Sequence, residues 1–314
     1  MNSAHLIQTL LWLTTLWLLT ACDVDGDLPP CQWNVQIDYT YAPYGTKFDV
    51  REYMRTYHHY VFNEQEVLVD TTGIACAPGQ VRFDLPPGKY TAVVWTNING
   101  NTLYVPQVQP GVSRMGELTL QRRDANTAPD QLYYAAIPFE VAEGLSYYEA
   151  TFTDAFARIT FHVHWAEGQQ PPVEELVDLN IRIDQAPSSL GFTPGQQVQA
   201  YRNDVACFLP ATVEPTTSHR KSVKCYGGEI ETAFVTGRLA RSDHILFRLY
   251  AGDTPLMKEI DLNRYFNETE MDLAGDCIQE YGIDIKIGDN IIIVTSINMG
   301  GWEEGGELGG GWTN

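Results

Sequence analysis

The side chains best suited to chemistry in this chain are six cysteines and a closely spaced pair of histidines. A thiol can carry a lipid, form a disulfide or bind a metal, and an imidazole can bind a metal or transfer a proton. His162 and His164 lie two residues apart, so on an extended strand they point to the same face, a spacing that some zinc sites use. No third ligand is identifiable, and His58 and His59 would point to opposite faces if extended. We therefore predict no metal site and no cofactor.

Cys22 follows a short apolar leader. The run from Leu6 to Leu19 is too short to cross a bilayer comfortably, and it ends in the small residues Thr20 and Ala21. Leu19-Thr20-Ala21-Cys22 resembles a bacterial lipobox, in which the chain is cut before the cysteine and the thiol receives a diacylglycerol. Residues 1–21 are therefore predicted to be a lipoprotein signal peptide, and acyl chains such as palmitate on Cys22 would hold the protein on a membrane. The alternative is an ordinary secretory signal that happens to be followed by a cysteine.

An acidic segment follows the predicted lipid site, over residues 22–30. Its carboxylates alternate in Asp23-Val24-Asp25-Gly26-Asp27, as in a calcium loop. An EF-hand loop beginning at Asp23 would need Gly at position 28 and Glu at position 34, where the chain has Leu28 and Asn34. The tract instead resembles the short signal that directs lipoproteins to the outer face of the outer membrane in Bacteroidetes-type bacteria. A solvated spacer is the alternative.

Five cysteines remain once Cys22 is set aside, and an odd number cannot all pair within one chain. Export permits disulfides, and Cys31 with Cys76 is the one pair that lies within the first half of the chain. Closing this loop would stabilise the fold by about 4 kcal/mol. The pattern does not choose among Cys207, Cys225 and Cys277, and buried free thiols are the alternative.

The net charge of −20 and the sequence motifs exclude several classes of function. Because such an acidic surface repels the phosphate backbone of nucleic acids, we expect no nucleic-acid partner. The chain has no Gly-x-Ser-x-Gly elbow, no His-Glu-x-x-His, no Walker loop and no Gly-x-Gly-x-x-Gly after a strand. We therefore predict that the protein is not an enzyme. A glycosidase-like pair of carboxylates would not be recognisable among forty acidic residues.

Alternation of apolar and polar residues predicts an all-β fold. From Trp33 to Tyr41 every second residue is apolar, which is the period of a half-buried strand. Val81 to Leu85 and Tyr90 to Trp95, joined by Pro86-Pro87-Gly88, predict a hairpin. Further strands are expected at Ala157–Trp165, Leu179–Ile183, Ile245–Tyr250, Ile283–Ile287 and Ile291–Ile297. Many short strands separated by turns favour antiparallel sandwiches.

The remaining pattern predicts few helices and a division into two domains. Only Phe48–Tyr57 and Val173–Val177 could form brief helices. A boundary near Gly144–Ala150 gives an N-terminal β-sandwich over residues 31–147 and a C-terminal one over residues 148–298. Glycine dominates residues 299–314, which we interpret as a flexible tail.

Four segments resemble the fimbrillin-associated anchor proteins, and the likeness covers most of residues 22–165. Three lie in the first half of the chain: a cysteine opening an alternating aromatic strand, a strand with an acidic turn and a returning strand, and a Pro-Gly turn with a Tyr two residues after the Gly. The fourth resembles the strand that opens the family's second domain. These segments are Cys31–Tyr41, Tyr60–Val69, Leu85–Trp95 and Ala157–His164. Asn63 and Gln65 depart from the pattern, since an Asp and a Gly are more usual there.

The resemblance implies two tandem transthyretin-like antiparallel β-sandwich domains with Greek-key connections. It also implies display on the outer membrane and a role in anchoring a fimbria, or pilus, and limiting its length. Pilus subunits of this type join when an extended segment of one chain completes the sheet of the next. The expected partners are therefore fimbrial pilin subunits, together with the outer membrane through the N-terminal lipid.

A rival hypothesis is glycan capture by a lipid-tethered β-sandwich of a polysaccharide uptake system. Exposed aromatic rings on outer strands could stack against sugars, and the candidate residues are Trp95, Trp165, Trp302 and Trp312. Alternation places Trp165 with the apolar set, and Trp95 is expected to be similar, which favours the core for both.

Overall fold

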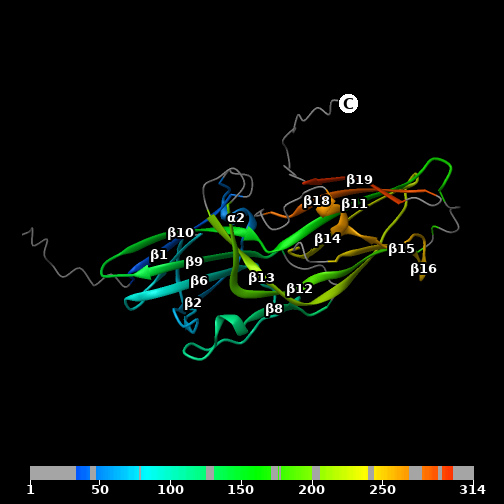
Figure 1. Cartoon of the computed structure of the whole chain (residues 1–314). Helices are drawn as coiled ribbons and strands as arrows, with labels where there is room; N and C mark the ends of the chain where they lie inside the picture. Colours follow the sequence, from blue (N-terminus) through cyan, green and yellow to red (C-terminus); the bar gives the residue numbers. More distant parts are fainter. Residues whose placement is uncertain are drawn as a thin grey trace, which may run out of the picture.

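A computed structural model describes residues 33–42, 47–77, 79–124, 131–170, 176, 178–199, 206–239, 244–268, 278–288 and 292–299. The predicted signal peptide, the acidic tether, Cys22, Cys31 and the glycine-rich tail lie outside these residues, apart from Met299, which ends the last strand. Figure 1 shows an elongated molecule built almost wholly of strands, with two β-rich bodies arranged end to end. The all-β fold expected from the sequence is confirmed.

Among the described residues, the first body has ten strands and two single helical turns. They are β1 (Val35–Tyr41), α2 (Val50–Tyr53), β2 (Tyr57–Asn63), β3 (Leu68–Asp70), β4 (Ile74–Ala77), β5 (Gln80–Phe83), β6 (Gly88–Thr96), β7 (Leu103–Tyr104), the 3-10 turn η1 (Met115–Glu117), β8 (Thr119–Arg122), β9 (Tyr133–Val141) and β10 (Ser146–Asp154).

In the part of the second body that the structure describes, there are nine strands and one short helix. They are β11 (Phe156–Trp165), β12 (Leu179–Gln199), β13 (Ala206–Ser222), β14 (Glu229–Gly237), β15 (Leu246–Ala251), β16 (Thr254–Pro255), β17 (Ile260–Asp261), α3 (Leu262–Glu268), β18 (Glu280–Ile287) and β19 (Ile292–Met299). No described helix is long and apolar enough to cross a membrane.

Eight strands of the first body form one sheet in the order β3-β2-β6-β9-β10-β1-β5-β4. One buried cluster takes side chains from both halves of this order, among them Val35 and Val81 from one half and Val61 and Val94 from the other. The sheet therefore folds over on itself and encloses this cluster as a sandwich core. The alternation in β1 follows directly, because Val35, Ile37, Tyr39 and Tyr41 face that core.

Strands β2, β6 and β9 are covered on both faces. Val94 packs in the sandwich core, while its neighbours Val93 and Trp95 pack in a second cluster with Leu120 and Phe192. This double burial explains why these strands carry continuous apolar runs rather than an alternating pattern.

The second body is a sandwich of two sheets. Its four-stranded sheet has the order β14-β11-β18-β19, and it faces the sheet that contains β15 and β12. Side chains from both sheets meet in one cluster, for example Phe161 from β11 and Phe247 from β15, whose ring centroids lie 4.6 Å apart.

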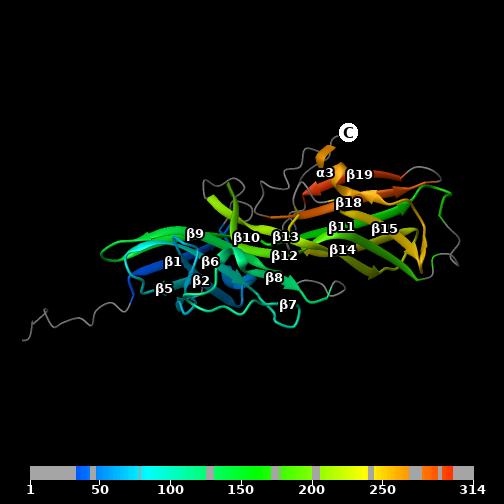
Figure 2. The same cartoon turned by 60° about the horizontal axis from the view of Figure 1, so that its bottom comes forward.

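The β12–β13 ribbon connects the two bodies (Figure 2). Near its start, β12 pairs with β15 of the second body, while farther along Leu190 pairs with Leu120 on β8. Leu190 and Phe192 then enter the cluster that covers β2, β6 and β9. The ribbon therefore ties the second body to the core of the first.

The two bodies repeat one strand arrangement. Each opens with a strand, β1 or β11, that lies between an antiparallel partner, β5 or β14, and a parallel partner, β10 or β18. The parallel pairs β1–β10 and β11–β18 differ from the antiparallel arrangement expected from the sequence. Parallel neighbours cannot be joined by a hairpin, and in each body a long stretch of chain separates the two strands.

Several sequence-based expectations need correction. The expected hairpin over residues 81–95 is wrong: β5 pairs with β1 and β4, whereas β6 pairs with β2 and β9. The segment Leu85–Pro87 instead carries the chain from one half of the folded sheet to the other. The helix expected at Phe48–Tyr57 is limited to α2, and α3 was not expected. The expected helix at Val173–Val177 lies outside the described residues, except for residue 176.

Strand β10 spans the expected domain boundary between residues 147 and 148. It pairs with β1 from Ser146 to Phe152 and with β9 at Thr153 and Asp154, so its residues lie in the sheet of the first body. The next strand, β11, begins at Phe156 in the sheet of the second body.

Candidate binding groove

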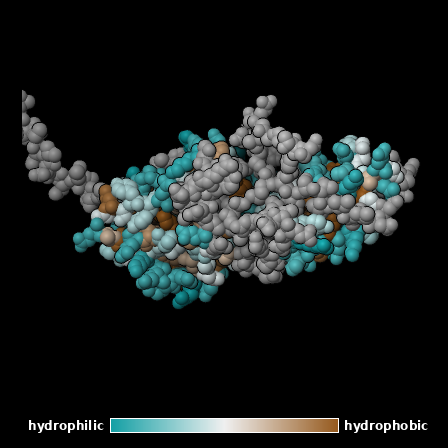
Figure 3. Space-filling model, turned by 45° about the horizontal axis from the view of Figure 1, so that its top comes forward, coloured by the Kyte–Doolittle hydropathy of each residue, from teal (hydrophilic) through white to brown (hydrophobic). Residues whose placement is uncertain are grey.

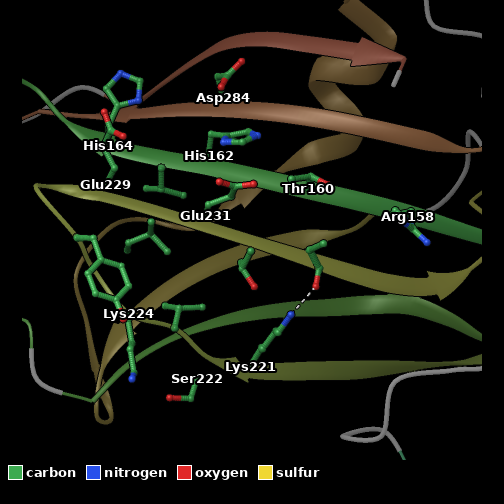
Figure 4. A pocket seen from close by; sticks show the side chains of 16 residues that line it. Arg158, Thr160, His162, His164, Lys221, Ser222, Lys224, Glu229, Glu231 and Asp284 are labelled. Carbon is green, nitrogen blue, oxygen red and sulfur yellow. Dashed lines mark hydrogen bonds between the residues drawn. The ribbon is translucent and has the colours of Figure 1, made fainter. Parts of the chain in front are cut away.

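A surface hollow, here called the groove, lies on the second body, on the outer face of the four-stranded sheet (Figure 4). Its volume is about 950 Å³. Strands β11 and β14 form its floor, the end of β13 and the segment after it form one wall, and Asp284 on β18 lies at the opposite side.

The polar floor follows from the two-residue period of β11. Ala157, Ile159, Phe161 and Val163 point into the sandwich core. The intervening residues therefore point outward, and Arg158, Thr160, His162 and His164 line the groove.

Strand register brings acidic residues beside both histidines. His162 lies directly opposite Glu231 on β14 and Asp284 on β18, and His164 lies opposite Glu229. The Arg158 N–H donates a hydrogen bond to the Gln279 carbonyl oxygen, which lies beside β18. Arg158 and every second residue after it on β11 therefore point their backbone N–H and C=O groups toward β18 and away from β14. The pairs with β14 are therefore of the non-hydrogen-bonded type, in which opposite side chains come closest.

This row of imidazoles and carboxylates does not form a metal centre. Within the described part of the chain, no group of three or more His, Cys, Asp or Glu side chains is placed to hold a metal ion. The groove instead offers a polar ligand both positively charged hydrogen-bond donors, such as Arg158, and negatively charged acceptors, such as Glu231.

A tight hairpin brings Tyr226 to the mouth of the groove. Gly227 and Gly228 both have positive φ angles, of 60° and 89°, which a two-residue hairpin turn of this kind requires. The hairpin leaves the Tyr226 ring 73% exposed, the highest value among the large apolar side chains described.

The outer edge of β14 is already occupied at several positions. Tyr226 and Glu229 exchange both backbone hydrogen bonds, of 2.9 and 3.0 Å. The Lys221 ammonium donates a 2.9 Å hydrogen bond to the Ala233 carbonyl. Gly237 approaches Pro187 so closely that a Cβ there would lie 2.6 Å from the Pro187 carbonyl oxygen. A further strand therefore cannot pair along this edge without displacing these contacts.

Of the four tryptophans singled out in the sequence, the two that the structure describes do not line the groove. Trp95 is fully buried, as expected, and Trp165 is partly buried against the core of the second body. Trp302 and Trp312 lie outside the described residues. The aromatic residue that does reach the groove, Tyr226, was not identified from the sequence, although its Gly-Gly turn is a recognisable hairpin signal.

The predicted lipid and disulfide sites lie mostly beyond the described structure. Cys22, Cys31 and Cys277 are outside it, and Cys76 lies on β4 at a position whose side chain is not described. Of the cysteines left open above, Cys207 is disulfide-bonded and Cys225 is a partly buried free thiol. The Cys31–Cys76 pair stays a prediction.

The fold is similar to those of solved proteins that share little sequence with this chain. The fimbrial anchor protein Mfa2 from Porphyromonas gingivalis matches with a TM-score of 0.62 at 15% identity, covering 85% of this chain and 97% of that protein. A candidate polysaccharide-binding protein from Bacteroides thetaiotaomicron matches with a TM-score of 0.60 at 13% identity, covering 85% and 98%. A candidate adhesin from Bacteroides ovatus matches with a TM-score of 0.62 at 11% identity, covering 88% and 96%. No curated protein matches this chain in sequence.

A family model matches nearly the whole chain. The model of the fimbrillin-A associated anchor proteins Mfa1 and Mfa2 covers residues 28–305. The match includes both bodies and extends well past residue 165, where the resemblance noted in the sequence ends. That resemblance is therefore confirmed: the chain belongs to the family of fimbrillin-A associated anchor proteins.

Proposed function

We propose that this protein is a surface lipoprotein that holds the base of a fimbria on the outer membrane and limits the length of the fibre. The observation that carries the proposal is the family match over both bodies. The lipobox-like Cys22 supplies the membrane attachment, and the adjacent pilin is the protein partner. The functional part of the molecule is then a binding surface rather than a catalytic site.

We further propose that the two bodies are tandem transthyretin-like domains. The repeated arrangement of β1 and β11, each between one antiparallel and one parallel partner, supports this division. The change of sheet after Asp154 favours a boundary at residue 155 rather than at residue 147.

Pilin binding by strand complementation requires a free sheet edge. Strand β14 is a poor acceptor, because Tyr226 and Lys221 already use its outward backbone groups. Strand β19 is a better one, since over Ile292–Met299 it pairs with β18 alone among the described strands. A pilin segment added at β19 would continue the four-stranded sheet, and main-chain hydrogen bonds would provide affinity.

Deletion of the gene tests the anchor role. Cells that lack the protein should release their fimbriae or carry longer ones, with growth on polysaccharides unchanged. Firmly attached fimbriae of normal length in the deletion strain would contradict the proposal.

Site-specific crosslinking tests the choice of edge. A photoreactive residue at position 296 on β19 should crosslink to the pilin in intact cells, whereas one at position 231 on β14 should not. Crosslinks from position 231 alone would move the pilin site to the groove.

Glycan capture is a second candidate, and the groove supports it. The exposed Tyr226 ring lies beside carboxylates and imidazoles, a combination that can stack against and hydrogen-bond a sugar. The similar fold of the candidate polysaccharide-binding protein points in the same direction. Isothermal titration with a glycan panel should then show binding that Tyr226→Ser abolishes and Tyr104→Ser, at another exposed tyrosine, does not.

A further inference from the structure

Exposed apolar side chains gather at the end of the first body where β1 begins. Leu145 is 47% exposed and Tyr147 is 62% exposed, and these are two of the five large apolar side chains described as exposed. They lie two residues apart at the start of β10, beside the beginning of β1, because the Ser146 N–H bonds to Asn34 O.

Trp33, which directly precedes this strand pair, completes the cluster. Its ring meets the Tyr147 ring edge-on, with centroids 6.3 Å apart, and the Arg82 guanidinium lies 4.1 Å from the Trp33 centroid. Arg82 is held in place because its Nε donates a 3.0 Å hydrogen bond to Gln36 Oε1. We call Trp33, Arg82, Leu145 and Tyr147 the entry patch.

The entry patch is the first surface after the proposed lipid that the structure describes. Ten residues lie between Cys22 and Trp33, so even a fully extended tether places the patch within about 40 Å of the lipidated thiol. The patch also lies at the tip of the first body, away from the second body, and Figure 3 shows apolar surface at that tip.

We propose that the entry patch rests in the headgroup region of the outer membrane and orients the protein. The inference rests on the proposed lipid at Cys22, which keeps the patch within reach of the membrane. Trp and Tyr combine an apolar ring with a polar group and are enriched at membrane–water interfaces, and an Arg beside them can reach lipid phosphates. With the patch on the membrane, the long axis stands away from the bilayer and presents the second body to the fibre.

The charge of the protein determines which lipid tests the proposal. A net charge of −20 repels anionic surfaces, so the contact must come from aromatic and apolar burial rather than from a basic patch. Zwitterionic phosphatidylcholine vesicles are therefore the appropriate probe.

The first experiment uses the mature chain with Cys22→Ser, which can carry no lipid. Its partition into phosphatidylcholine vesicles, measured by cosedimentation, should fall about tenfold or more when Trp33, Leu145 and Tyr147 are all changed to Ser. The matched control changes Tyr104, Val112 and Tyr226 to Ser, since these are also exposed and Arg123 lies 4.2 Å from the Tyr104 ring centroid. Equal partition of the two triple variants, or no partition of the parent chain, would overturn the proposal.

The second experiment uses the lipidated protein in vesicles that contain brominated phosphatidylcholine. Bromine should quench a component of tryptophan emission that is missing in Trp33→Phe, a variant that keeps the aromatic packing. Identical quenching of both proteins would overturn the proposal, as would crosslinks from the patch to pilin without any quenching. Mass spectrometry of the native protein shows separately whether Cys22 carries a lipid. An unmodified Cys22 would contradict the proposed lipid anchor, whereas the vesicle partition of the Cys22→Ser chain tests the entry patch without any lipid.

Discussion

The Tyr41 hydroxyl donates a 2.8 Å hydrogen bond to the carboxylate of Asp154, which lies fully buried where the first body meets the second. Tyr41 ends β1 and Asp154 ends β10, so the bond joins the ends of the two parallel strands. On the other side, the Arg238 guanidinium donates a 3.0 Å hydrogen bond to the Asp154 backbone carbonyl. One acidic residue therefore links β1, β10 and the chain that leaves β14.

The buried Asp154 makes stability depend on pH. Burial raises its pKa to about 7, although the Tyr41 hydrogen bond and the positive charge of Arg238 each lower it. In the unfolded chain the carboxyl group loses its proton near pH 4, so between about pH 4 and 7 the folded state binds more protons. The free energy of unfolding should therefore fall as the pH rises through this range.

Asp154→Asn tests this dependence, because an amide does not titrate. The free energy of unfolding of both proteins is measured in urea from pH 4.5 to 8. As the pH rises, the parent should lose stability relative to the variant. A difference that is constant with pH would show that Asp154 keeps an ordinary pKa.

Removing the donor to Asp154 should be destabilising. Tyr41→Phe leaves the ring contacts with Tyr53 and Tyr133 in place and deletes the hydroxyl alone. The expected loss is about 1–3 kcal/mol, since a buried acceptor loses its partner. Tyr90→Phe removes an exposed hydrogen bond to Pro86 O and should cost less. Equal losses for the two variants in denaturant titrations would contradict the role of burial.

Phe192 should couple the unfolding of the two bodies. It extends from the β12–β13 ribbon into the first body, where its ring lies 4.8 Å from Tyr60 and 5.9 Å from Trp95. Phe192→Ala should cost about 3–5 kcal/mol and separate one calorimetric transition into two. Gln197→Ala, at an exposed position of the same ribbon, should change neither quantity. A single transition in Phe192→Ala would mean that other contacts couple the bodies.

The sequence predicted those strands that have one face exposed to solvent. Alternation located β1 and β11 to within two residues, because their outward positions remain polar. It could not show how the strands pair where both faces are buried, as in β6 and β9, since a continuous apolar run carries no information on its neighbours. This is the physical reason that the hairpin expected over residues 81–95 was wrong.

The connecting ribbon and the groove were not predictable for different reasons. Pro187 and Pro194 interrupt the strand signal of β12, and the register shifts around them accommodate the missing N–H groups. The groove depends on register between strands far apart in sequence, because His162 on β11 meets Glu231 on β14 and Asp284 on β18. The sequence showed that both histidines share a face, but it could not show which acidic residues lie beside them.

The close contact between Gly237 and Pro187 provides a final test of how β14 is held against the ribbon. A Cβ at position 237 would lie 2.6 Å from the Pro187 carbonyl oxygen, a backbone atom that cannot move without shifting β12. Gly237→Ala should therefore cost about 1–3 kcal/mol. Gly282→Ala on β18 is the matched control, because no atom lies within 4 Å of its added Cβ, and it should be neutral or slightly stabilising. Denaturant titration of both variants measures the difference, and a neutral Gly237→Ala would show that β12 and β14 can separate at this point without loss.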